Sequence, residues 1–272
     1  MKDTGKQLST WEYLRLVGVE DLPPLTHPLD PGYDPATAES HIEQSSHLMA
    51  AYKLSTAAWL VASEAATRRK IAAARAHNVP TVTGGTPFEV AVVQNKLELY
   101  LDLCAGLGIS RIECAEGFTE VPLQPHAVVQ MARERGLEIQ YEMGKKQEGA
   151  FTEDSLDEAI ARGKRWLDAG AKQVVVEARE SARGVGMFDN EGNLNRDYAD
   201  RFAREFGFET AIFEAPNKAS QFAFLNHFGR RVQLSNVRLE EILRVEIYRR
   251  GMHADAYLMP HLRPNDTSHQ TV

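Results

Sequence analysis

Short apolar runs alternate with longer amphipathic segments along most of this chain. The short runs are typical of buried strands, and they lie at residues 52–55, 80–83, 111–114, 138–142, 173–177, 210–214 and 232–234. Apolar residues recur at helical spacing in the longer segments, at residues 64–77, 87–107, 125–135, 155–169, 197–206, 219–228 and 239–250. A strand that is followed each time by a helix predicts a parallel sheet.

The number and length of these units decide between two α/β folds. A weaker strand at residues 25–29 completes a set of strand–helix units of about 30 residues each, which fits a closed (β/α)8 barrel. The alternative is an open doubly wound sheet, but no Gly-x-Gly-x-x-Gly turn or P-loop follows an early strand. We therefore predict the α/β class, with a (β/α)8 TIM barrel in a single domain.

The two ends of the chain differ from this repeating part. Prolines interrupt the first segment repeatedly, so we predict an irregular N-terminal extension over residues 1–34. The barrel catalytic domain is predicted over residues 35–258, and a polar C-terminal tail over residues 259–272. Inside the barrel, Thr86 to Glu89 predict a helix start, with Thr86 as N-cap, Pro87 in the first turn and Glu89 closing a capping box.

Composition and charge narrow the class of protein. Of 272 residues, 43% are hydrophobic and 25% are charged, which is ordinary for a globular chain. The formal net charge of −7 argues against a surface that coats nucleic acid. No run approaches the roughly 20 apolar residues that span a bilayer, and the N-terminus lacks the apolar core of an export signal.

These features predict a cytoplasmic protein without a nucleic-acid or membrane partner. Its two cysteines, Cys104 and Cys114, lack metal-type spacing, so we expect both to be reduced and interior. Barrels of this size often assemble, and a homo-oligomer is expected, although no interface stripe is identifiable in the sequence.

Polar residues recur at the ends of the predicted strands, namely Lys53, Thr83, Glu113, Glu142, Glu177, Glu214 and Gln233. In a barrel, the carboxyl ends of the strands meet at one mouth, where barrel enzymes carry their active sites. Carboxylates that face one cavity repel each other unless cations neutralise them. A single strand-end Glu is often an ordinary surface residue, but four in register on successive strands favour a functional cluster.

The cations that this cluster needs are close in sequence. Lys53 lies on the second strand, Lys145 and Lys146 follow the fifth, and Arg179 follows the sixth. The two adjacent lysines could equally form a solvated loop. Mg²⁺ is a further candidate, because it prefers oxygen ligands and usually takes only one or two protein carboxylates together with substrate oxygens.

Three loops have features of anion binding. Gly84, Gly85 and Thr86 lead directly into a helix, and Ser235 and Asn236 precede another; free N–H groups at helix starts favour phosphate or carboxylate. In the third loop, after the sixth strand, Arg183 precedes Gly184 and Gly186, and this loop could be a basic lid or merely a turn.

Several of these segments together resemble the phosphosulfolactate synthase family. The resemblance covers roughly residues 50–256 and rests on GGTPFE (84–89), RIECAEG (111–117), EMGKK (142–146), VVEARES (175–181), FEAP (213–216), VQLSNV (232–237) and GMHAD (251–255). It implies a (β/α)8 barrel lyase that adds sulfite to phosphoenolpyruvate with Mg²⁺, giving phosphosulfolactate on a route to coenzyme M. A plant heat-stress protein also looks like this family, so fold alone does not fix the reaction.

The sequence departs from the family pattern at four places. An Asp-Lys-Gly on the first strand reads 30–32 DPG here, and a Ser-Asp-Gly after the fourth strand reads 115–117 AEG. An Asn-Leu-Gly-Asn near the eighth strand reads 233–236 QLSN, and a late Arg is replaced by His253. All four changes touch the expected site, so the nucleophile stays open.

The resemblance also implies roles for the candidate residues. Glu177 and Glu214 are the favoured Mg²⁺ ligands, with Glu142 and Glu113 as further candidates. Lys145 is the expected proton donor, and Lys53 is the second choice.

Binding of the two anions falls to another set of groups. Arg179, Arg183 and the N–H groups near Ser235 and Asn236 would hold the phosphate and the anionic nucleophile. Two other functions stay open: addition of a different nucleophile to a similar enol acid, and a non-catalytic stress-related role.

Overall fold

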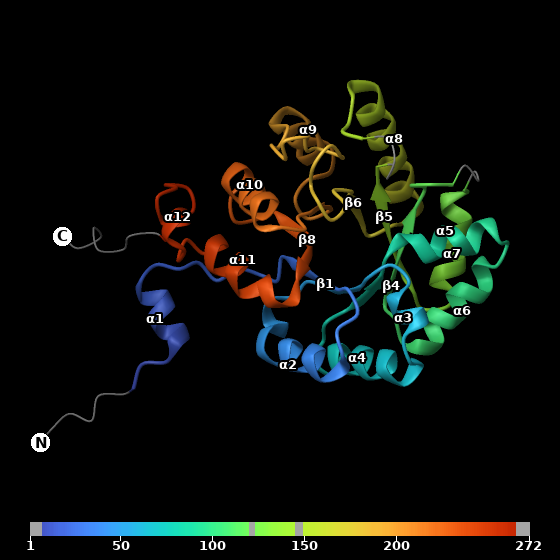
Figure 1. Cartoon of the computed structure of the whole chain (residues 1–272), viewed down its shortest axis with the longest axis horizontal. Coiled ribbons are helices and arrows are strands. Elements are labelled where there is room, and N and C mark those ends of the chain that lie inside the picture. Colours follow the sequence, from blue (N-terminus) through green and yellow to red (C-terminus); the bar gives the residue numbers. More distant parts are fainter. Residues whose placement is uncertain (1–6, 120–122, 145–148, 265–272) are drawn as a thin grey trace, which may run out of the picture.

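The structure is a computed structural model that describes residues 7–119, 123–144 and 149–264. A closed parallel barrel forms its centre, in which each strand pairs with the next and the first pairs with the last (Figure 1). The strands are β1 (Thr26–Asp30), β2 (Tyr52–Leu54), β3 (Thr81–Thr83), β4 (Arg111–Ala115), β5 (Glu138–Met143), β6 (Gln173–Val176), β7 (Ala211–Glu214) and β8 (Gln233–Arg238). The predicted TIM barrel in one domain is therefore confirmed.

Helices surround the barrel and connect its strands. They are α2 (Pro35–Ser45), α3 (Ala58–Val61), α4 (Glu64–Ala76), α5 (Gly85–Val93), α6 (Leu97–Leu107), α7 (Pro125–Arg133), α8 (Glu153–Ala169), α9 (Arg196–Phe206), α10 (Lys218–Phe228) and α11 (Ile242–Arg249). Short 3-10 turns lie at Ser46–Leu48 and Leu239–Glu241, and α12 (Ala254–Tyr257) follows the last long helix. In the described part of the chain, no helix combines the length and apolar character needed to cross a bilayer.

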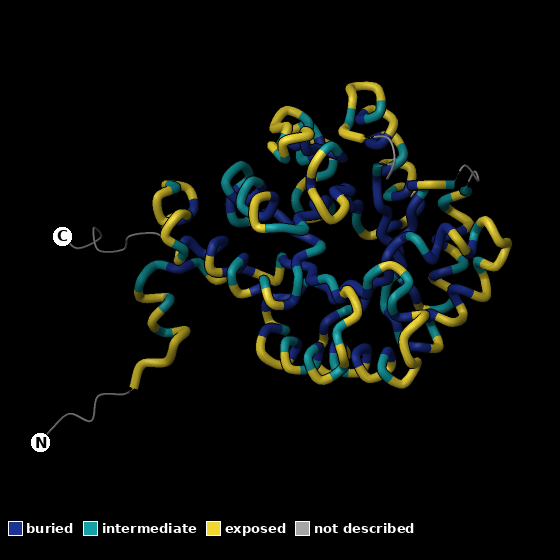
Figure 2. Tube along the Cα trace, viewed as in Figure 1, coloured by how far each residue is buried: buried dark blue, intermediate teal, exposed yellow. Residues whose placement is uncertain are grey.

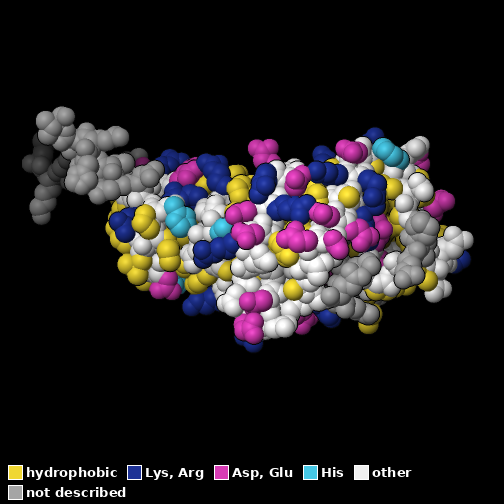
Figure 3. All heavy atoms as spheres, turned by 90° about the horizontal axis from the view of Figure 1, so that it is seen from above, with side chains coloured by type: hydrophobic (Ala, Val, Ile, Leu, Met, Phe, Trp, Pro, Cys, Tyr) yellow, Lys and Arg dark blue, Asp and Glu magenta, His cyan; other side chains and the backbone are white. Residues whose placement is uncertain are grey.

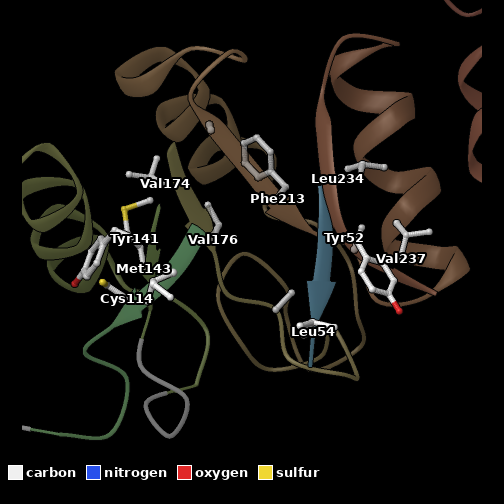
Figure 4. Packing of buried hydrophobic residues seen from close by; sticks show 14 of the residues in the cluster. Tyr52, Leu54, Cys114, Tyr141, Met143, Val174, Val176, Phe213, Leu234 and Val237 are labelled. Carbon is white, nitrogen blue, oxygen red and sulfur yellow. The ribbon is translucent and has the colours of Figure 1, made fainter. Parts of the chain in front are cut away.

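The main apolar core lies between the outer face of the strands and the helices, because side chains alternate between the two faces of a strand. Tyr141 on β5 stacks on Trp166 of α8 at 4.9 Å between ring centroids, and Phe213 on β7 packs against Phe224 of α10. Figure 4 shows part of this layer, and Figure 2 shows that burial is concentrated in the strands. Cys104 and Cys114 are both free and buried, as predicted.

The other face of the strands points into the barrel and is unusually polar. Barrel interiors are typically filled by branched apolar residues. Here Lys53, Glu113, Gln140 and Glu142 are all buried on that face. On the outer surface seen in Figure 3, acidic and basic side chains are interspersed.

The first segment of the chain is more ordered than predicted. Besides the strand predicted near residues 25–29, which is β1, it contains helix α1 (Thr10–Leu16), which was not predicted and starts with a capping box between Ser9 and Glu12. The barrel therefore begins at Thr26, and the boundary predicted at residue 35 is wrong. A strand tolerates Pro28 here because the β1–β8 register shifts between His27 and Pro28.

Two predictions around residues 85–107 are also wrong. The single predicted helix over residues 87–107 is two helices, α5 and α6, separated where Asn95 adopts a left-handed φ of 53°. The expected capping box at Thr86 is absent, because α5 begins at Gly85 with Gly84 at the N-cap. The carboxylate of Glu89 instead accepts hydrogen bonds from the backbone of Phe118 and Thr119.

Candidate active site

A cavity of about 410 Å³ opens at the carboxyl ends of the barrel strands. Five buried charged side chains from five strands or strand ends line it: Lys53, Glu113, Glu142, Glu177 and Glu214. The structure thus brings together the strand-end cluster that the sequence predicted. Two predicted strand ends lie elsewhere: Thr83 faces Tyr100 of α6, and Gln233 begins β8 at the other end of the barrel.

Lys53 is the centre of this cluster. Its ammonium group lies 2.9 Å from Oε1 of Glu113 and 3.1 Å from Oε1 of Glu214. Burial by itself lowers the pKa of Lys53, but the carboxylates around it outweigh burial and hold the pKa well above its usual range. Lys53 is therefore a permanent positive charge at the floor of the cavity.

Glu113 is held on both of its oxygens. Oε1 accepts a hydrogen bond of 3.1 Å from the backbone N–H of Gly85, and Oε2 accepts one of 2.8 Å from the side-chain amide of Gln140. Burial raises the pKa of Glu113 to about 8; Lys53 opposes this rise, and the nearby carboxylate of Glu142 adds to it.

The loop after β6 carries the next groups. Its first residue, Glu177, accepts a hydrogen bond of 2.6 Å from the backbone N–H of Arg179 through Oε1. Oε2 of Glu214 accepts a hydrogen bond of 3.0 Å from the N–H of Ala178, which ties this loop to β7. Arg179 lines the cavity, where the sequence predicted a cation near the carboxylates. Its backbone has a left-handed φ of 54°.

Two glycines allow the backbone to pack closely beside the cavity. At Gly186, a Cβ would lie 2.1 Å from the carbonyl oxygen of Glu177, and φ is 55°. At Gly84, a Cβ would lie 2.8 Å from the backbone nitrogen of Thr56. Only glycine fits these two positions; Gly84 lines the cavity, and Gly186 packs against the backbone of Glu177, which lines it too.

The predicted anion-binding loops are altered by the fold. The N–H of Gly85 is directed at Glu113, so this helix start holds a carboxylate of the protein. Ser235 and Asn236 do not start a helix, because β8 continues to Arg238. Asn236 lines the cavity, whereas Ser235 is buried and donates a hydrogen bond of 3.2 Å to the side-chain oxygen of Asn236.

Other predicted residues take different places. Thr86 lines the cavity, as expected for a binding residue, but Arg183 is exposed and does not line it. Lys145 and Lys146 lie outside the described residues, directly after Gly144.

The departures from the family pattern largely point away from the cavity. Asp30, the retained residue beside the Pro31 departure, faces outward, where its carboxylate accepts hydrogen bonds from Tyr52 and from Lys70 of α4. Glu116 accepts a hydrogen bond of 3.1 Å from the indole of Trp166, and His253 is the N-cap of α12.

Sequence reasoning missed several lining or supporting residues: Ser55, Thr56, Glu180, Ser181 and Gln140. Gln140 could have been found, because it shares one face of its strand with Glu142 two residues later. The others follow strand ends, and loop geometry decides their orientation.

The described lining is acidic overall. It carries the carboxylates of Glu113, Glu142, Glu177, Glu180 and Glu214 against the cations of Lys53 and Arg179. No group of three or more His, Cys, Asp or Glu side chains among the described residues is arranged as a metal cluster. Because the lining is acidic overall, an anionic ligand needs further positive charge in this cavity.

The closed barrel with a charged pocket at its mouth defines the class of protein, a TIM-barrel enzyme. Residues 24–255 match the family model described as (2R)-phospho-3-sulfolactate synthase. The chain is 30% identical to a phosphosulfolactate synthase of Methanocaldococcus jannaschii over 86% of this chain and 93% of the relative. It is also 30% identical to one of Methanothermobacter thermautotrophicus, over 85% and 90%. The chain belongs to the phosphosulfolactate synthase family.

Solved structures agree on the fold. A type I 3-dehydroquinate dehydratase from Clostridium difficile is similar with a TM-score of 0.53 at 12% identity, over 84% of this chain and 92% of that one. This similarity concerns the barrel architecture alone.

Proposed function

We propose that this protein adds sulfite to phosphoenolpyruvate and forms phosphosulfolactate. The observation that carries the proposal is the buried cluster around Lys53, in a polar cavity of a chain whose relatives are named phosphosulfolactate synthase. In this reaction the sulfur lone pair forms a C–S bond to the methylene carbon. The electron pair of the carbon–carbon double bond moves toward the carboxylate, and a proton is then added to the adjacent carbon.

Mg²⁺ is the cofactor that fits the donor set. Glu142 and Glu177 end adjacent strands, line the cavity and offer the hard oxygen ligands that this ion prefers. Glu113 and Glu214 both contact the ammonium group of Lys53, which makes them supporting groups rather than metal ligands in this proposal. When bound, Mg²⁺ supplies a Lewis acid for the developing charge on the substrate carboxylate.

The cationic residues have separate roles. Lys53 keeps its proton at neutral pH, because its pKa is held high, so it stabilises negative charge and is a poor proton donor. Lys145 is the proposed donor to the carbon that bears the phosphate. Arg179 at the rim, together with Thr86 and Asn236, is proposed to contact the anionic groups of the substrates.

A related addition with a different nucleophile is the second candidate. Pro31 stands where the family motif on the first strand has a lysine, and the carboxylate of the neighbouring Asp30 is turned outward to Lys70. The cavity therefore lacks the contribution of a lysine at position 31. A non-catalytic role is disfavoured, because a fold kept only for binding a protein partner has no need of buried charges.

The decisive experiment incubates the purified protein with phosphoenolpyruvate, sulfite and Mg²⁺. Phosphorus and proton NMR would follow loss of phosphoenolpyruvate and formation of a phosphorylated sulfonate. Product that depends on Mg²⁺ and disappears with EDTA supports the proposal. Folded protein that binds phosphoenolpyruvate but gives no product with sulfite would contradict it and favour another nucleophile.

A further inference from the structure

Below the cavity, the barrel interior contains a chain of polar side chains where apolar packing is usual. Arg111 at the start of β4 is clamped by two hydrogen bonds of 3.2 and 2.8 Å to Glu138. Its guanidinium also donates to the side-chain oxygens of Gln140, at 3.4 Å, and Gln173, at 2.6 Å.

Gln140 is the member of this chain that reaches the active site. Only 2% of its surface is exposed, and its amide nitrogen donates a hydrogen bond of 2.8 Å to Oε2 of Glu113. Arg111 contacts the amide oxygen, which fixes the orientation of the amide and directs its nitrogen at Glu113. Gln173 shares the contact with Arg111, but its own amide donates to Gln233 and to the carbonyl of Glu209.

We propose that Gln140 is a positioning residue, which is oriented by Arg111 and fixes the carboxylate of Glu113 against Lys53 and Gly85. Its importance for turnover rests on the proposed sulfite addition.

The physical argument concerns the plane of the Glu113 carboxylate. Oε1 is shared between Lys53 and the N–H of Gly85, and the direction of Oε2 is set by Gln140. Without an amide donor, Oε2 is a buried acceptor that lacks its partner, which favours rotation of the carboxylate. Rotation would move Oε1 and with it the ammonium group of Lys53. Small displacements of charged groups in an active site reduce turnover strongly.

The kinetic test compares Gln140→Met with Gln173→Met. Both replace an amide that contacts Arg111 with an unbranched apolar side chain of similar size, but only the first removes a contact to Glu113. We expect kcat to fall about 10-fold to 100-fold in Gln140→Met with little change in KM, and to stay near the wild-type value in Gln173→Met. Gln140→Asn, which keeps an amide but is one methylene too short, should share the defect if the Met variant fails to fold.

A spectroscopic test does not depend on activity. In ¹⁵N-lysine spectra, the buried ammonium groups of Lys53 and Lys70 should give slowly exchanging signals, assigned with Lys53→Arg and Lys70→Arg. Gln140→Met and Gln140→Asn should shift or broaden the Lys53 signal and leave that of Lys70, while Gln173→Met should leave both.

An unchanged Lys53 signal in folded Gln140 variants, or an equal change in Gln173→Met, would overturn the positioning role. Equal values of kcat in the Gln140 and Gln173 variants would do the same. If the wild type adds no sulfite while the Lys53 signal still responds only to Gln140, the proposed reaction fails and the positioning role stands.

Discussion

The backbone N–H of Gly85 donates a hydrogen bond of 3.1 Å to the carboxylate of Glu113. The N–H group at the start of α5 therefore binds a carboxyl group that belongs to the protein. This contact places β4, α5 and the floor of the cavity in one rigid arrangement.

Replacement of Gly85 by alanine should disrupt that arrangement. A Cβ at Gly85 would lie 2.7 Å from Cβ of Ala115 and 3.4 Å from Oε2 of Glu142. We expect Gly85→Ala to lower the free energy of unfolding by about 1–3 kcal/mol and to reduce kcat/KM. Gly106→Ala is the control, because this exposed position in α6 has open space, and it should stabilise the protein by about 0.5–1 kcal/mol. Urea unfolding and steady-state kinetics measure both effects; equal behaviour of the two variants would argue against the close contact.

Substitutions of Lys53 and Lys70, both buried, should distinguish effects on stability from effects on catalysis. Lys53 pairs with Glu113 and Glu214 inside the barrel, while Lys70 pairs with Asp30 on its outer side. Lys53→Met and Lys70→Met should each destabilise the protein by about 3–5 kcal/mol, because each leaves a buried carboxylate without its cation. Turnover should be lost only in Lys53→Met, measured well below both melting temperatures. Active Lys53→Met would refute the electrostatic role.

Glu113 should make stability fall as pH rises. Its pKa is raised from an ordinary 4.5 to about 8 by burial, so the folded state binds more protons than the unfolded state between these values. This contribution is fully present below pH 4.5 and is lost as pH rises through 8, by about 1 kcal/mol per pH unit. Urea unfolding in EDTA between pH 6.5 and 8 should show this decline in the wild type and a flatter profile in Glu113→Gln. A wild-type profile that is flat over that range would contradict the shift.

His27 should have the opposite effect at lower pH. His27 is buried beside Gln233, at the end of the barrel opposite the cavity. Burial lowers the pKa of His27 from 6.5 to about 4, although a hydrogen bond with Gln233 opposes the shift. The contribution of His27 is present above pH 6.5 and is lost as pH falls through 4, again by about 1 kcal/mol per pH unit. The difference in unfolding free energy between wild type and His27→Gln should therefore narrow as pH falls from 6.5 to 4. A constant difference would show that His27 does not titrate there.

Mg²⁺ binding should depend on Glu177 more than on Glu180. Both line the cavity, but Glu177 is buried at a strand end and Glu180 is exposed. Glu177→Gln should weaken Mg²⁺ binding in the presence of phosphoenolpyruvate by at least about 10-fold, measured by calorimetry. Glu180→Gln removes the same charge from the rim and should change the affinity far less. Similar losses in both variants would point to a general charge effect.

The alternation of short apolar runs with longer amphipathic segments determined the fold of this protein and the position of its active site. A parallel barrel is specified by the order, number and length of its strand–helix units, and the local periodicity of apolar residues indicates all three. The same periodicity placed Lys53, Glu113, Glu142, Glu177 and Glu214 at one mouth, because the carboxyl ends of parallel strands meet there.

Only the tertiary structure decided what each group contacts. Gly85 looked like a site for a substrate anion, but the neighbouring strand brings Glu113 to its N–H. Asp30 ends the first strand like the other acids, yet the alternation of faces turns it outward to Lys70. Gln140 became part of the site through Arg111, 29 positions earlier in the chain. Such pairings depend on the register between strands, and a sequence read along one strand does not contain that register.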